Sequence, residues 1–249
     1  MFPMPNPEPP TKAPAEAIVA KPFRPMLQVD SFAWPAVCDA RHPAAQAALD
    51  QLAAGLIGVQ GNRRTVVAVA GTRTGAGCTT LLLSAAKRLA RRRLDVALVD
   101  ADRATPELAA RLGLLPELGW EQVVAGRLPL PEVVIESIED GLALLPLCSS
   151  DHERAVDVCS PAVDLGPAVT CLRGHYDLVL LDLGVPDPTA NPIRQDTGSW
   201  LDGVVLVHDV RSGSLGDLLH TRNHLTEAGV PVLGVVENFA SDEAQPRVA

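Results

Sequence analysis

Apolar and polar positions alternate along this chain in blocks that predict strands and helices in turn. Six short and almost continuous apolar runs predict strands that are buried on both faces, because such strands have no polar side. They are Thr65–Ala70, Val96–Asp100, Leu142–Leu147, Leu178–Leu183, Val204–His208 and Val232–Val236. Helices are predicted between them at Thr79–Arg92, Pro106–Leu112, Glu117–Ala125, Pro167–Arg173 and Ser214–Ala228. This alternation favours an α/β fold with a doubly wound, mainly parallel sheet and helices on both faces.

A further helix is predicted upstream of the first strand, at His42–Gly61. Its apolar side chains recur at helical spacing, at Ala45, Ala48, Leu49, Leu52 and Leu56. Two later helices carry start signals. Thr105 and Pro106 suit an N-cap and first helical position, and Ser214 with Asp217 fits a capping box.

The length of 249 residues suits one α/β domain with appendages, which we place at 42–239. Aromatic residues make up only 3% of the chain, so Val, Leu and Ala must form most of the core. Residues 1–25 are proline-rich and predict a disordered arm. The segment 26–41 and the residues just before it carry Phe23, Phe32 and Trp34, so we expect this region to dock on the domain or a partner. Residues 240–249 predict a disordered tail.

Charge and cysteine content exclude several classes of protein. The net charge of −9 gives no support for nucleic-acid binding, which needs a basic face. Five cysteines without a C-x-x-C pair indicate reduced thiols in the cytoplasm rather than a disulfide framework or a zinc site. No apolar run approaches the ~18–20 residues of a membrane span. One basic stretch, "AAKRLARRR" (Ala85–Arg93), suits a helix C-terminus in solvent, with a phosphate- or membrane-facing patch as the alternative.

The stretch "VAVAGTRTGAGCTTLLLSAAKRL" has the layout of a phosphate-binding loop between a strand and a helix. The usual motif is G-x-x-x-x-G-K-[ST], and here Cys78 stands in the lysine position and Thr79 in the Ser/Thr position. Gly75 and Gly77 would allow close backbone approach, and amides from Gly77 to Thr80 would face an anion at the helix start. An ordinary tight turn explains the same glycines, so both interpretations stay open.

Carboxylates end two of the predicted strands. Asp100 and Asp102 follow one strand and Asp182 ends another. Beside a phosphate loop, such groups would handle Mg²⁺ and an attacking hydroxyl. Aspartates that only begin turns are the alternative.

Together these motifs give a resemblance to a known family. The runs "LVDADRATPELAARLGL", "HYDLVLLDLGVP" and "LDGVVLVHDVRSGSLGDLLHTRNHLTEAGVPVLGVVENF" resemble the P-loop bacterial tyrosine kinases that regulate capsule and exopolysaccharide synthesis. That family lies within the wider Min/Par partitioning ATPase class. The resemblance covers roughly residues 43–239, and the helix at His42–Gly61 falls where the family has its oligomerisation helix.

The resemblance implies ATP and Mg²⁺ as cofactors. Thr79 and Asp182 would be the metal residues, and Asp100, Asp102 and Asp182 the catalytic carboxylates. The nucleotide-binding residues would be Arg73, Gly75, Ala76, Gly77, Cys78, Thr79, Thr80 and Asn238. Within this set, Arg73 replaces the signature lysine of the partitioning ATPases, and Asn238 falls where related ATPases contact adenine.

Departures from the family pattern change the expected function. Cys78 supplies no cation, the tyrosine-rich tail is missing with Tyr176 the one tyrosine, and the predicted oligomerisation helix lacks the family's Glu/Arg pattern. We therefore expect a degenerate kinase-like protein with weak or lost nucleotide binding. It would regulate or scaffold exopolysaccharide or capsule synthesis, in the cytoplasm or at the inner face of the cytoplasmic membrane. Its expected partner is a membrane-bound protein of that machinery, and a homodimer is an option. The alternatives are an active Mg-ATP-dependent ATPase or tyrosine kinase that uses Arg73, and a Min/Par-type positioning ATPase.

Overall fold

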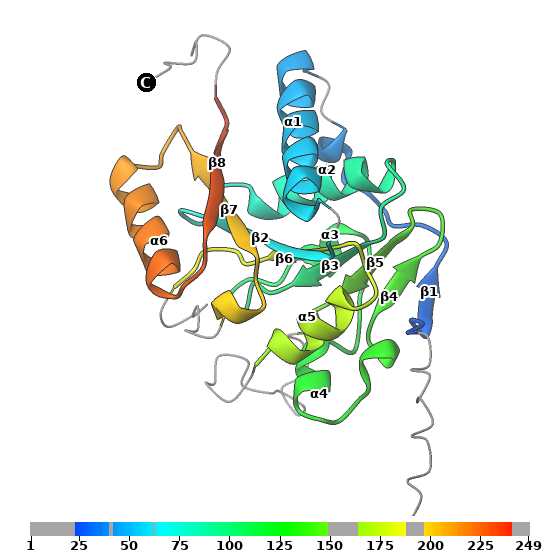
Figure 1. Cartoon of the computed structure of the whole chain (residues 1–249). Coiled ribbons are helices and arrows are strands. Elements are labelled where there is room, and N and C mark those ends of the chain that lie inside the picture. The colour runs from blue at the N-terminus through cyan, green and yellow to red at the C-terminus, as the bar shows by residue number, and fades with distance from the viewer. Residues whose placement is uncertain (1–22, 40–41, 62, 149–163, 188–196, 241–249) are drawn as a thin grey trace, which may run out of the picture.

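The computed structural model describes residues 23–39, 42–61, 63–148, 164–187 and 197–240 (Figure 1). Within them, eight strands form one sheet. The strands are β1 (Leu27–Val29), β2 (Thr65–Gly71), β3 (Val96–Asp100), β4 (Ile135–Ser137), β5 (Leu142–Leu145), β6 (Leu178–Asp182), β7 (Gly203–Asp209) and β8 (Val232–Asn238). Their order across the sheet is β1-β4-β5-β3-β6-β2-β7-β8.

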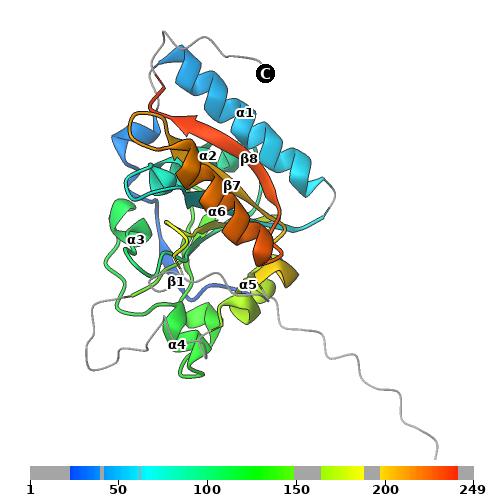
Figure 2. The same cartoon turned by 90° about the vertical axis from the view of Figure 1, so that its left-hand side faces the viewer.

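The helices lie on both faces of this sheet. They are α1 (Pro43–Gln60), α2 (Cys78–Ala90), α3 (Leu108–Arg111), α4 (Trp120–Val124), α5 (Gly166–Arg173) and α6 (Leu215–Glu227), with short 3-10 helices η1 (Ala36–Cys38), η2 (Leu130–Glu132) and η3 (Thr197–Ser199). One core contains side chains of α1, α2 and α3, and a second core contains those of α4, α5 and α6. In both views β8 lies between α1 and α6 (Figure 1, Figure 2).

The predicted doubly wound α/β fold is confirmed. Strands β5, β3, β6, β2, β7 and β8 run parallel to one another. Every residue of β2, β3 and β6 is buried, which explains their continuous apolar sequence. Parallel strands bring their carboxyl ends to one edge of the sheet, where ligands bind in folds of this type.

Two strands at one side of the sheet, β1 and β4, were not predicted from the pattern of apolar residues. β4 pairs antiparallel with β5, and β1 pairs parallel with β4. Each has three residues, too few to show a period. These two strands are held together by contacts between the segments that follow them. Asp140, after β4, accepts hydrogen bonds from the Phe32 amide and the Trp34 indole, after β1, both at 2.8 Å. The segment from Phe23 to Cys38 therefore lies on the domain, with Phe32 and Cys38 buried.

The expected start of the helix at Thr105 and Pro106 is wrong. α3 begins at Leu108, with Glu107 as its N-cap. The cause is local, because the Asp102 carboxylate accepts the amides of Ala104 and Thr105 and holds them in a turn. The capping box of α6 is confirmed: Ser214 accepts the Asp217 amide at 3.1 Å, and Asp217 accepts the Ser214 amide at 2.9 Å.

The apolar stripe predicted for α1 is only partly buried. Leu56 is buried against the domain and Leu49 and Leu52 are partly buried, whereas Ala45 and Ala48 are exposed. Among the described helices, none combines the length and apolar character needed to cross a bilayer. The predictions for residues 1–22 and 241–249 fall outside the described residues.

Candidate functional site

The glycine loop connects β2, at the centre of the sheet, to the N-terminus of α2. Gly75 and Gly77 have φ values of +80° and +93°, which side chains rarely allow. Gly77 is the N-cap of α2 and has no side chain with which to cap it. The amides of the first turn have no acceptor within the helix, and the helix dipole is positive here. This end of α2 can therefore accept an anion.

Cys78 is the first residue of α2, and its thiol is folded into the loop. A Cβ atom added to Gly71 would lie 2.7 Å from the Cys78 sulfur, so the glycine leaves space for the thiol. Burial, and then the nearby charge of Asp182, raise the pKa of Cys78. The thiol is therefore neutral near pH 7, and the position carries no positive charge.

Arg73, the cation within the loop, points to another part of the protein. Its guanidinium donates to the Ser212 carbonyl oxygen, just before α6. Hydrogen bonds with Ser214 are the main cause of the lowered pKa of Asp217, in the first turn of α6, and the charge of Arg73 also contributes to it. Arg73 thus links the loop to α6, and its guanidinium is engaged outside the phosphate position.

Three aspartates meet at the carboxyl ends of β3 and β6. Asp100 and Asp182 are paired positions on these neighbouring strands, and both are buried. Asp102 lies two residues beyond β3, against Gly184. Gly184 has a φ of +57°, and an added Cβ atom there would collide with the Asp102 carboxylate. Only glycine at position 184 permits this close approach.

Each aspartate has a different set of hydrogen bonds. Besides two amides, Asp102 accepts the Thr105 hydroxyl at 2.8 Å. Asp182 accepts the Gly184 amide at 3.2 Å, and the Thr79 hydroxyl acts to lower its pKa. Asp100 Oδ2 accepts the amide of Leu108 at 3.0 Å, whereas its buried Oδ1 has no hydrogen-bond partner. The orphan oxygen needs a proton or a bound group to satisfy it.

The electrostatics of the cluster favour a positive ligand. Burial, followed by the charge of Asp182, raises the pKa of Asp100 well above its usual value. Burial is also the main cause that raises the pKa of Asp182 to about 6, against the hydrogen bonds from Thr79 and Gly184. None of the ion pairs between described residues involves Asp100, Asp102 or Asp182. The cluster is therefore negative and without a protein counter-ion among the residues described.

The oxygen atoms of Thr79, Asp100 and Asp182 fit a hard cation such as Mg²⁺. No preformed group of three or more His, Cys, Asp or Glu ligands occurs in the described part of the chain. Mg²⁺ differs from other metals in this respect, since it is held by one or two carboxylates together with waters and substrate phosphates. The residues present therefore fit Mg²⁺ that arrives with a phosphate compound, and would supply charge neutralisation for it.

The end of β8 forms the other wall of the loop. Asn238 donates its side-chain amide to the Ala76 carbonyl oxygen at 2.8 Å and accepts the Phe239 amide at 2.9 Å. The Phe239 ring lies 3.4 Å from the Arg211 guanidinium carbon, in a cation–π contact. The predicted adenine residue thus lies at the site, where its amide supports the loop backbone.

Sequence reasoning missed several groups around this loop. The Thr72 hydroxyl oxygen lies 3.3 Å from His208 Nδ1. Arg211 packs on the ring of Phe239. His208 lies near the end of β7, and Phe239 follows β8 directly. Asp100 and Asp182 were identified because they stand at the ends of strands. The same reasoning could have identified His208 and Phe239.

A glycine loop between a buried strand and a helix, with carboxylates on the adjacent strand ends, defines the P-loop class of α/β fold. Solved structures with this fold include the kinase domain of VpsO, at TM-score 0.64 and 23% identity over 79% of this chain and 96% of that one. The kinase domain of the Escherichia coli tyrosine kinase ETK gives a TM-score of 0.70 and 17% identity, over 89% and 85%.

The septum site-determining protein MinD of Pyrococcus horikoshii, solved with Mg-ADP, gives a TM-score of 0.61 and 21% identity, over 74% of each chain. No protein-family model and no curated protein sequence matches the chain. At these identities, the comparisons establish the fold that the chain shares with bacterial tyrosine kinase domains and MinD-type ATPases.

Proposed function

We propose that the chain is a degenerate P-loop protein that keeps the metal half of the site and has lost the cation of the phosphate half. One observation carries this proposal. The Thr79 hydroxyl interacts with Asp182, and the paired Asp100 has an unsatisfied buried oxygen, while the lysine position holds a buried thiol with a raised pKa. Mg²⁺ with a nucleotide phosphate would satisfy the carboxylates of the metal half. At the phosphate half, the neutral Cys78 thiol does not attract the negative phosphate.

The missing lysine has a large effect on binding and a larger one on chemistry. A charge-assisted hydrogen bond contributes about 1.5–3 kcal/mol, so its loss weakens phosphate binding roughly tenfold to a hundredfold. Charge stabilisation dominates phosphoryl transfer, so the transition state loses more than the ground state. Tyr176 is partly buried just before β6, which makes it a poor substrate for trans-phosphorylation. The proposed role is therefore regulatory or scaffolding. By its resemblance to the capsule-type kinases, the proposed pathway is exopolysaccharide or capsule synthesis, with a membrane-bound partner.

Calorimetric titration of ATP and ADP, with and without Mg²⁺, tests this proposal. Cys78→Lys should bind Mg-ATP roughly tenfold to a hundredfold more tightly than the natural protein. Cys171→Lys makes the same chemical change at an exposed position of α5 and should leave the affinity unchanged. Equal affinities for the natural protein and Cys78→Lys would contradict the proposal, because the loop would then work without its lysine.

The second candidate is a working Mg-ATPase or kinase. The intact carboxylate cluster is the observation that favours it. Steady Mg²⁺-dependent turnover by the natural protein, abolished in Asp182→Ala, would establish this candidate. Nucleotide-dependent dimerisation would instead support a Min/Par-type positioning ATPase.

A further inference from the structure

The C-terminal end of α2 and the turn after it carry a concentration of positive charge that the fold does not require. Five of the seven residues from 87 to 93 are basic, in a chain whose 30 acidic residues outnumber its 21 basic ones. One or two cations suffice to complement a helix C-terminus, and neighbouring like charges on a helix repel. A basic cluster with this cost points to a function of its own.

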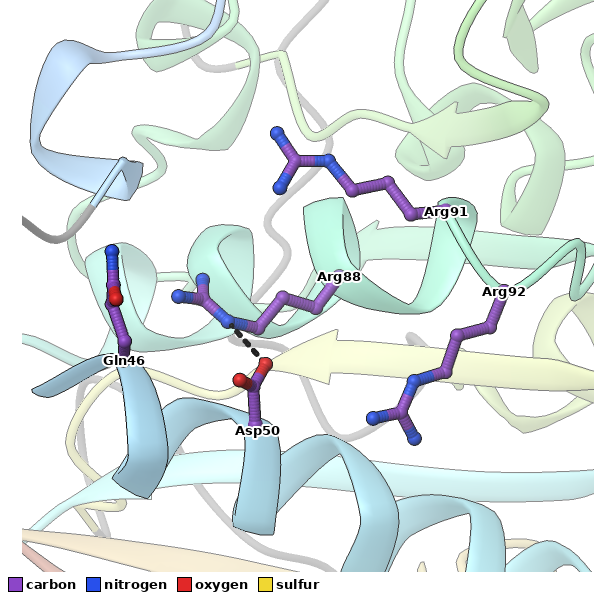
Figure 3. Close-up of a pocket in the computed structure, with 5 residues that line it drawn as sticks. All are labelled: Gln46, Asp50, Arg88, Arg91 and Arg92. Atoms are coloured by element: carbon purple, nitrogen blue, oxygen red, sulfur yellow. Dashed lines mark hydrogen bonds and ion pairs between the residues drawn. The ribbon is translucent and has the colours of Figure 1, made fainter. Parts of the chain in front are cut away.

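A pocket of about 290 Å³ lies between this end of α2 and the first half of α1. It is lined by Gln46, Asp50, Arg88, Arg91 and Arg92 (Figure 3). Arg88 reaches toward α1 from α2 and Arg92 from the turn after it, while Arg91 extends away from them (Figure 3). Three guanidiniums and one carboxylate leave the lining with a formal charge of 3 − 1 = +2.

Arg88 is fixed in place at the centre of the pocket. Its Nε donates to Asp50 at 3.1 Å, and its Nη1 donates to the Ser84 carbonyl oxygen at 3.3 Å. The side chain is only 12% exposed, so these contacts hold the guanidinium in one orientation. The remaining nitrogen, Nη2, keeps its donors for a ligand. Asp50 is therefore a positioning residue as well as a partial counter-ion.

The charge of the other two arginines is not neutralised. The Arg92 guanidinium forms no hydrogen bond or ion pair with another described residue. Arg91 has Asp39 at 3.9 Å and is 68% exposed, an arrangement that contributes little binding free energy. The pocket thus holds one oriented guanidinium and two available ones.

We propose that this pocket binds the phosphate group of an anionic ligand, with Arg88 and Arg92 as the binding residues and Arg91 at the rim. Arginine is suited to this task, because its planar fork of donors matches phosphate oxygens in pairs. The site is separate from the glycine loop. α2 has 13 residues, so at 1.5 Å per residue its two ends lie roughly 20 Å apart. The phosphate can come from a free phosphate compound or from a phospholipid headgroup, and the chemistry of recognition is the same.

The test uses two probes on the full chain, at fixed ionic strength. In the first arm, inorganic phosphate and pyrophosphate are titrated while backbone amide signals are followed by NMR. This separates binding between α1 and α2 from binding at the glycine loop. In the second arm, the protein is sedimented with vesicles of phosphatidylglycerol or of phosphatidylcholine. The variants are Arg92→Gln and Arg91→Gln, and the control is Arg222→Gln, the same change at an exposed position of α6.

We expect the Arg92→Gln exchange to weaken binding roughly tenfold or more, and Arg91→Gln to weaken it less, with no change in Arg222→Gln. If Arg92→Gln weakens the binding of inorganic phosphate or pyrophosphate, the ligand is a free phosphate compound. If it weakens only the binding of phosphatidylglycerol vesicles, the ligand is a lipid headgroup. The proposal is overturned if neither probe binds, if amide shifts are confined to the loop, or if the control loses as much affinity. Displacement of phosphate by an equal concentration of chloride would overturn it too.

Discussion

Asp100 and Asp182 are directly paired positions on the neighbouring strands β3 and β6, and both carboxyl groups are almost inaccessible to solvent, at 1% and 2% exposure. Charge on either one opposes ionisation of the other, and burial opposes ionisation of both. The fold therefore holds electrostatic free energy that a proton or a cation would release. A domain selected for stability alone would not keep this pair, so the pair favours a ligand at this edge of the sheet.

Replacing Asp182 by Asn should stabilise the ligand-free protein near neutral pH. The pKa of Asp182 in the fold is about 6. This value is raised above the ordinary value of about 3.9, so the folded state binds the proton more tightly than the unfolded state. The stability that protonation provides is full below about pH 4 and is lost as the pH rises through about 6.

The variant cannot lose that stability, so its advantage should be on the order of 2 kcal/mol above about pH 6 and vanish near pH 4. Urea unfolding across this pH range measures the difference. Asp95→Asn, at an exposed position, is the control and should show no such trend. A variant that is less stable than the natural protein near neutral pH would contradict the expectation.

Removing Arg73 should leave nucleotide binding almost unchanged. The guanidinium donates to the Ser212 carbonyl oxygen near α6, so it contributes to the packing of the loop rather than to a phosphate. Arg73→Gln should keep the affinity for Mg-ATP within about twofold and cost about 1 kcal/mol of stability for one exposed bond. Calorimetry and thermal unfolding measure the two effects. A loss of tenfold or more in affinity would show that Arg73 turns to the phosphate and replaces the missing lysine.

The sequence predicts most of the sheet, because the strands at its centre are buried on both faces. β2, β3 and β6 appear as continuous apolar runs, and the glycine loop and Asp182 follow from their positions at strand ends. Neither β1 nor β4 could be predicted in this way. They are short and are held by a contact between positions 108 residues apart, from the Phe32 amide to Asp140.

Side-chain directions at the site were also beyond the sequence pattern. Arg73 stands in a motif position that implies a phosphate contact, yet its guanidinium binds a carbonyl group near α6. The start of α3 depends on which amides Asp100 and Asp102 accept, a choice that propensity does not determine. Tertiary contacts decided both cases.

Asp140 should be important for the attachment of the N-terminal segment. Its carboxylate accepts the Phe32 amide and the Trp34 indole, each at 2.8 Å, and the Ser137 hydroxyl at 2.5 Å. Asp140→Ala would leave these donors without an acceptor and should cost about 3 kcal/mol. Glu139→Ala, at the exposed neighbouring position, should cost less than about 0.5 kcal/mol.

Hydrogen exchange distinguishes a local from a global effect of Asp140→Ala. We expect faster exchange from Phe32 to Cys38, because these residues lose their attachment while β2 and β6 keep their ladder bonds. Equal acceleration throughout the sheet would contradict a local role for Asp140.

Gly77 should be the most sensitive glycine of the loop, for two separable reasons. Its φ of +93° strains any other residue, and an added Cβ atom would collide with the Asn238 amide that supports Ala76. Gly126 also has a positive φ, +68°, but an added Cβ atom there meets no atom within 4 Å. Gly126→Ala therefore measures backbone strain alone, expected at about 1–2 kcal/mol.

Gly77→Ala should cost more than Gly126→Ala, and the excess should depend on Asn238. In the double variant Gly77→Ala/Asn238→Ala the collision is absent, because the shorter side chain no longer reaches the loop. The double variant should therefore be less destabilised than the sum of the two single variants, by about 1 kcal/mol in a double-mutant cycle. Denaturant unfolding of the four proteins measures this coupling. Strict additivity would mean that Asn238 does not hold the loop, and that the wall formed by the end of β8 is not part of the site.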